Sequence, residues 1–152
     1  MRPSTGLPAA RLAAKPPGEL ALIPDEDELL VAGLGQLGGR GAAWTARRLR
    51  KDVYELDKTL ASPLDEVFAH VAGQLGSIGR VAAQTGPGDG KALVRGVVGS
   101  GAMNLNPAVI TVTMTSATDG STIVHIRGAA KEGLIKQRAG EKAAKRLESL
   151  LG

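Results

Sequence analysis

The order of hydrophobic periods in residues 52–152 is the strongest constraint on the fold. A period-two alternation over residues 52–60 predicts a strand with one polar face. Ser62 and Pro63 follow as an N-cap and a first helical residue, and apolar side chains then recur at helical spacing. Gly76 and Gly79 predict the end of this helix.

Four further runs of strand-forming residues follow, at residues 80–85, 91–98, 108–116 and 121–130, with residues 86–90 joining the first two. A second helix is expected over residues 131–151, with an apolar stripe formed by Ile135, Ala139, Ala143, Leu147 and Leu150. Gly140 would let this helix lie close to a sheet. The order predicts an α+β fold in which a curved antiparallel sheet of about five strands packs against a long C-terminal helix.

The last two strands predict a specific register. The apolar residues of both strands must share one face, while Thr111, Thr113 and Thr115 face the other way. A three-residue loop over 118–120, with Gly120 left-handed, satisfies this condition. It pairs Met114 with Val124 and Val112 with Ile126, whereas a two-residue loop would place Thr115 opposite Val124.

The N-terminal part of the chain lacks these periods. Residues 1–24 are rich in Pro, Ala and Gly, which predicts a disordered tail. Residues 25–51 form a Gly-rich and basic extension whose structure the pattern leaves open. Residues 52–152 are expected to form one domain, because 43% of the chain is apolar and supplies a sufficient core.

Composition excludes several kinds of chemistry. The chain has no Cys, which rules out disulfides, thiolate metal sites and thiol nucleophiles. His70 and His125 are expected on exposed faces, and neither has a carboxylate partner at a useful spacing. We therefore expect no catalytic residue, no metal site and no cofactor. No apolar run is long enough for a membrane span, and a cytoplasmic protein is expected.

A glycine-rich segment at residues 33–38 resembles the dinucleotide-binding fingerprint of Rossmann proteins. It follows an apolar run at residues 29–32 and precedes a candidate helix at residues 42–50. The resemblance implies phosphate binding by the loop, with Asp57 in the place of the ribose-binding acid. Gly39, Gly41 and the antiparallel pattern downstream oppose it, so a nucleotide-dependent enzyme is one alternative function.

Residues 54–63 running into residues 64–68, together with the final helix, resemble the helix-grip superfamily of the START and pollen-allergen type. The resemblance implies a curved antiparallel sheet around a long C-terminal helix and an apolar cavity. Four strands after the first helix are fewer than that superfamily usually has. A smaller sheet of the TATA-binding-protein type fits the count better.

The expected function is a non-enzymatic module that binds a small apolar ligand or a partner. The candidate ligand-lining residues, for which a filled core is the favoured interpretation, are Leu56, Val94, Met103, Asn104, Leu105, Val112, Met114, Val124, Ile126 and Ile135. Three of them lie in a long loop, residues 99–107, at one end of the sheet.

The first alternative, ahead of the nucleotide-dependent enzyme, is a basic protein that binds nucleic acid or phosphate. The net charge is +4, and an anionic partner would meet Arg47, Arg48, Arg50, Lys51, Lys142 and Lys145 if the two clusters share one face. Against this, Glu132 with Lys136 and Glu141 with Lys145 form acid-before-base pairs typical of a solvated helix. The oligomeric state does not follow from the sequence.

Overall fold

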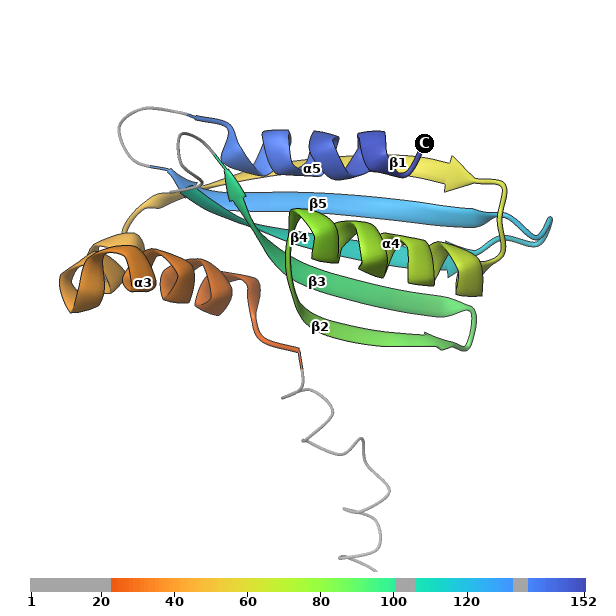
Figure 1. Cartoon of the computed structure of the whole chain (residues 1–152), viewed down its shortest axis with the longest axis horizontal. Coiled ribbons are helices and arrows are strands. Elements are labelled where there is room, and N and C mark those ends of the chain that lie inside the picture. Colours follow the sequence, from red (N-terminus) through yellow and green to blue (C-terminus); the bar gives the residue numbers. More distant parts are fainter. Residues whose placement is uncertain (1–22, 101–105, 133–136) are drawn as a thin grey trace, which may run out of the picture.

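The computed structural model describes residues 23–100, 106–132 and 137–152 of the chain. Within these ranges it contains three helices and five strands (Figure 1). In chain order they are α3 (Glu26–Ala46), β1 (Arg50–Leu60), α4 (Leu64–Ile78), β2 (Gly79–Gly88), β3 (Lys91–Ser100), β4 (Asn106–Ser116), β5 (Thr122–Glu132) and α5 (Ala139–Leu150). The predicted order of strand, helix, four strands and helix is confirmed.

The five strands form one antiparallel sheet in the order β1-β5-β4-β3-β2. Strands β2 to β5 are sequential neighbours, and β5 returns to pair with β1 along its full length, from Arg50↔Glu132 to Leu60↔Thr122. The predicted antiparallel α+β architecture is therefore correct, and β1 and β2 form the two edges.

The hairpin between β4 and β5 has the predicted register. Met114 pairs with Val124 and Val112 pairs with Ile126, whereas Thr115 lies opposite Ile123. The amide of Ala117 donates to the carbonyl of Ser121, which leaves residues 118–120 as the loop, and Gly120 is left-handed with a φ of 84°. The requirement for one apolar face thus selected the correct loop length.

The hairpin between β2 and β3 differs from the expectation. We expected residues 86–90 to form the connection, but β2 continues to Gly88 and only Asp89 and Gly90 remain as the turn. Their φ values are 53° and 73°. Both are left-handed, as in the two-residue turns whose twist matches that of the paired strands.

Helices α4 and α5 cover one face of the sheet, which we call the inner face. Figure 1 shows them side by side, with α4 over β2 and β3 and α5 along β5 and β1. The apolar side of α4 consists of Leu64, Val67, Val71 and Leu75, which are buried against the sheet. The core of the protein lies in this layer.

Helix α3 packs on the opposite, outer face at one end of the sheet (Figure 1). Its Leu30 is fully buried against Val109 of β4 and Ala129 of β5, which both point away from α4 and α5. The extension that sequence left open is thus a helix with its own small apolar contact. The N-terminus of the helix is stabilised in two ways: Asp25 accepts a hydrogen bond from the Asp27 amide, and acidic residues in the first turn interact favourably with the helix dipole.

The start of α4 corrects a capping prediction. The N-cap is Pro63, and Ser62 provides no side-chain cap. Instead, the carbonyl of Ser62 accepts a hydrogen bond of 2.8 Å from Thr122 Oγ1, because β5 begins beside the end of β1. Gly76 lies inside the helix, which ends at Ile78 with Gly79 as C-cap.

The C-terminal helix is shorter than predicted. It starts at Ala139, because Lys131 and Glu132 pair with Lys51 and Arg50 and so extend β5. Leu150 is 38% exposed, while Leu151 is buried and completes the apolar side of the helix. Glu132 belongs to β5, and Lys136, its predicted helical partner, lies outside the described residues.

Helix α5 contacts β5 backbone to backbone. A Cβ atom placed on Gly128 would lie 2.1 Å from the carbonyl oxygen of Gly140, and one on Gly140 would lie 2.7 Å from that of Gly128. Neither backbone oxygen can move without shifting its whole element. The expectation that glycine brings the helix close to the sheet is confirmed, with a second glycine on the strand.

This contact predicts that Gly128→Ala destabilises the protein by at least about 2 kcal/mol, because α5 must move away from β5. Gly73→Ala is the matched control, since Gly73 is an exposed position of α4 where an added Cβ meets nothing within 4 Å. That substitution should stabilise by up to about 1 kcal/mol through helix propensity. Urea unfolding of both variants measures the difference, and equal stabilities would contradict the close contact.

Candidate functional site

The inner face brings together the apolar residues that the sequence singled out on the strands. Val94, Val112, Met114, Val124 and Ile126 all have 0% exposure and belong to one cluster, and half-buried Leu56 packs against it. Met103, Asn104, Leu105 and Ile135 lie outside the described residues. The five buried side chains are closed off from solvent in this conformation.

Two buried polar side chains flank this apolar layer among the described residues. Thr122 lies at one end of β5 and donates to Ser62, as described above. Glu132 lies at the other end of β5, where it is 5% exposed. Its Oε1 accepts a hydrogen bond of 2.9 Å from the amide of Ala139, the first residue of α5.

Glu132 therefore caps the N-terminus of α5 with its side chain, a role that the N-cap residue Arg138 does not fill. The N-cap residue Arg138 is left-handed, with a φ of 54° and a ψ of 43°, and makes no side-chain cap. A carboxylate at a helix N-terminus is stabilised by the exposed amides and by the helix dipole. Local sequence patterns miss this cap because it comes from the preceding strand.

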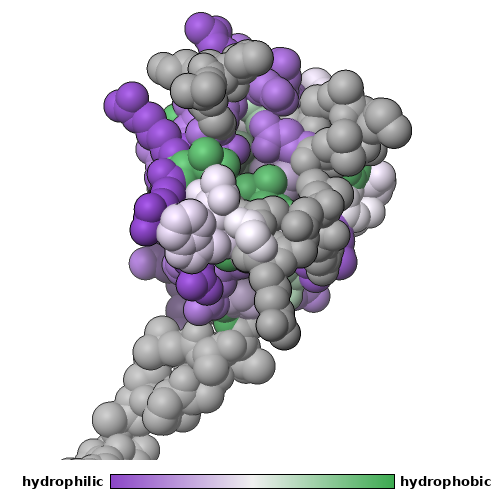
Figure 2. All heavy atoms as spheres, turned by 90° about the vertical axis from the view of Figure 1, so that its left-hand side faces the viewer, coloured by the Kyte–Doolittle hydropathy of each residue, from purple (hydrophilic) through white to green (hydrophobic). Residues whose placement is uncertain are grey.

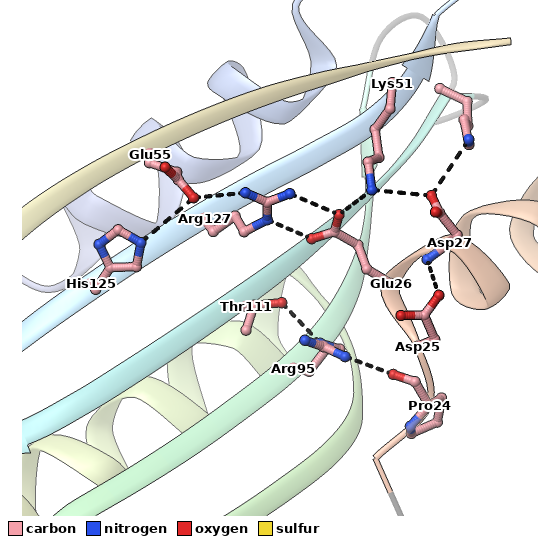
Figure 3. Close-up of polar contacts among 11 residues, drawn as sticks. Pro24, Asp25, Glu26, Asp27, Lys51, Glu55, Arg95, Thr111, His125 and Arg127 are labelled. Atoms are coloured by element: carbon pink, nitrogen blue, oxygen red, sulfur yellow. Dashed lines mark hydrogen bonds and ion pairs between the residues drawn. The ribbon is translucent and has the colours of Figure 1, made fainter.

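On the outer face, charged side chains hold α3 to the sheet (Figure 3). We call this group, Glu26, Asp27, Lys51, Arg127 and Lys131, the α3 clamp. Buried Glu26 accepts from Arg127 Nε at 2.9 Å and from Lys51 Nζ at 3.0 Å. Asp27 Oδ1 lies 3.3 Å from Lys51 Nζ and 3.4 Å from Lys131 Nζ.

The clamp favours the charged form of Glu26. Burial raises the pKa of this carboxyl, but hydrogen bonds and charge from Arg127 and Lys51 outweigh burial and hold its pKa below 4.5. The pKa of Lys51 is raised, mainly by its hydrogen bond to Glu26. Beside the clamp, Arg95 of β3 donates one hydrogen bond of 2.8 Å to the carbonyl of Pro24 and another of 2.9 Å to Thr111 Oγ1 of β4. These two bonds link the residue that precedes α3 to β3 and β4.

The prediction that neither histidine has a carboxylate partner is wrong for His125. Its Nδ1 lies 2.7 Å from Asp57 Oδ1, and its Nε2 lies 3.8 Å from Glu55, which also pairs with Arg127 at 2.7 Å. Asp57 and His125 are opposite one another in the β1–β5 register. Sequence spacing could not show this pair, since 68 residues separate the two; only the register of non-adjacent strands reveals it.

The glycine-rich segment does not form a phosphate-binding loop. Residues 33–38 lie inside α3, without a preceding strand, and Asp57 points to the outer face with His125. Gly33 lets α3 approach Pro107, whose side chain lies 3.2 Å from a Cβ placed on Gly33. The nucleotide hypothesis thus loses its structural basis.

A surface pocket of about 440 Å³ opens along α3. Its lining residues are Asp27, Glu28, Val31, Ala32, Gly35 and Arg47. Figure 2, which looks onto this end of the molecule, shows small apolar patches among hydrophilic side chains. The mixture of both charge signs around the pocket favours no single class of ligand.

The structure does not bring the two basic clusters onto one face. Lys142 and Lys145 lie on α5, over the inner face, where Lys145 pairs with Glu141 at 2.7 Å as predicted. Lys51 belongs to the α3 clamp on the outer face, and exposed Arg48 stacks on Trp44 at 4.0 Å. Arg47 and Arg50 are exposed near the junction of α3 and β1.

The α3 clamp predicts that Glu26→Gln lowers the free energy of unfolding by about 2 kcal/mol at neutral pH, because Arg127 and Lys51 lose a charged partner. A lowered pKa in the folded state means that the stabilisation is complete above 4.5 and is lost as the pH falls below it. The difference in the free energy of unfolding between the variant and the wild type should therefore disappear at acidic pH. Exposed Glu28→Gln is the control, with an effect within about 0.5 kcal/mol, and a gap independent of pH would contradict the clamp.

In the part of the chain that the structure describes, no helix has both the length and the apolar character to cross a membrane. No protein-family model and no curated protein matches the chain.

Similar chains do occur among solved structures. The Mll3558 protein from Rhizobium loti is 14% identical with a TM-score of 0.38, and the match covers 68% of this chain and 96% of that one. Ara h 8.0201 is 8% identical with a TM-score of 0.40, and the match covers 67% of this chain and 93% of that one. The ZhuI aromatase/cyclase from a Streptomyces species is 15% identical with a TM-score of 0.29, and the match covers 67% of this chain and 85% of that one. None of these matches assigns a superfamily, a ligand or an activity to this chain.

Proposed function

We propose that this protein is a non-enzymatic module that binds a small apolar ligand between the sheet and helices α4 and α5. The observation that carries the proposal is the chemical character of the inner layer. Six of the predicted lining residues meet there, and all of them are aliphatic or Met. Such a surface recognises a ligand by apolar burial, with few polar groups to orient it.

The helices provide the way in. Both α4 and α5 contact β3 and β4, so the line between them runs over the central strands that carry Val94, Val112 and Met114. Because these side chains are fully buried, a ligand enters only when the two helices separate. Met114 suits such a site, since its unbranched side chain adapts to different neighbours.

Toluene is a suitable first probe, because it is apolar and carries no hydrogen-bond donor. We expect toluene to shift the methyl resonances of Met114, Val112 and Ile126 in a methyl-labelled sample. Val53 and Ile123 are internal controls, since they are 39% and 45% exposed on the outer face, and their resonances should stay in place.

The same titration should raise the melting temperature, with a stabilisation of about 2.7 kcal/mol once free toluene reaches about a hundred times its dissociation constant. Shifts confined to Val53 and Ile123 would show surface adsorption and refute the proposal. Unchanged inner methyl groups at saturating toluene would show that the layer is only a core.

A further inference from the structure

We infer that Glu132 is a ligand-recognition residue, and that the ligand of the inner layer carries a hydrogen-bond donor, a hydroxyl or an ammonium group, at the Glu132 end. This inference rests on the proposed function and adds the chemical class of the ligand. It starts from one atom: Oε2 of Glu132 is buried and has no hydrogen-bond partner among the described residues.

The two oxygens of this carboxylate differ in their surroundings. Oε1 accepts the Ala139 amide at 2.9 Å, which anchors the side chain at the start of α5. A carboxylate is a favourable group at a helix N-terminus, and only one of its two oxygens is used there. A buried charged oxygen without a donor is costly, and native proteins rarely leave one without a ligand, ion or water.

Toward the middle of the sheet the neighbours of Glu132 on the inner face are apolar and small, and on β1 its register partner is the exposed Arg50. In β5 the even-numbered residues face α5, so Ala130 is the nearest residue on the same side, and it pairs with Ala108 of β4. Ala108 in turn pairs with Val98 of β3. All three are at most 1% exposed. A ligand here would therefore combine an apolar body with one donor directed at Oε2.

The arrangement also excludes ligands. An anionic group next to Oε2 would place two hydrogen-bond acceptors together with no donor between them, which is unfavourable. Fatty-acid-like carboxylates are thus predicted not to bind with their carboxylate group at this end of the layer. Alcohols and amines meet an acceptor there.

A matched set of probes tests the inference: toluene, benzyl alcohol, benzylamine and benzoate share one ring and differ in the polar group. For the wild-type protein we expect benzyl alcohol and benzylamine to bind at least about tenfold more tightly than toluene, the gain of one hydrogen bond to a charged acceptor. Benzoate should not bind. Tighter binding of the amine than of the alcohol would identify an ammonium ligand, and the reverse a hydroxyl ligand.

Glu132→Gln tests the residue itself. The Gln side chain retains an acceptor for the Ala139 amide but replaces Oε2 by an amide donor, so the advantage of benzylamine over toluene should disappear. Glu141→Gln is the matched control: it replaces a half-buried glutamate in the first turn of α5 that pairs with Lys145, and it should leave the advantage unchanged.

The outcomes separate this inference from the proposed function. If toluene binds the inner layer as tightly as the two donors, the inference is wrong and the proposed function stands. If no probe binds there, the proposed function fails. If Glu132→Gln does not fold, shifts of the Ala108 and Ala130 methyl groups by benzylamine in the wild type, larger than those by toluene, support the inference, and equal shifts overturn it.

Discussion

The contact between Gly128 and Gly140 determines how the inner layer is built. Two backbones touch there without any intervening side chain, so α5 lies as close to β5 as helix and sheet can approach. This proximity buries Ala143, Ala144 and Leu147 on the helix. It also brings the first amide of α5 to the carboxylate at the end of β5, so the candidate recognition residue depends on two glycines that never touch it.

Strand β5 serves two environments through its alternation. Its even-numbered residues Val124, Ile126 and Ala130 enter the apolar layer, whereas odd-numbered Arg127 lies on the outer face and binds Glu26 of α3. A register shift by one residue would bury Arg127 under α5 and expose Ile126, and this penalty keeps the sheet in a single register.

Prediction from the sequence succeeded where one period controlled a segment. The alternation over β1, β4 and β5 and the helical spacing in α4 led to correct elements and to the correct pairing of Met114 with Val124. It failed where a distant partner competed with a local signal. Ser62 has the chemistry of an N-cap, yet its carbonyl binds Thr122, and residues 131–132 read as a helix start but pair with β1.

The sequence by itself determined the α+β class, the order of the elements and the apolar residues that meet on the inner face, because side-chain periodicity is a local property. Only the tertiary structure decided that residues 33–38 lie in a helix packed on the outer face, that His125 meets Asp57, and that one oxygen of buried Glu132 has no hydrogen-bond partner among the described residues. Each of these depends on which strands are neighbours. That choice is made by contacts between residues far apart in the chain, and no single segment contains it.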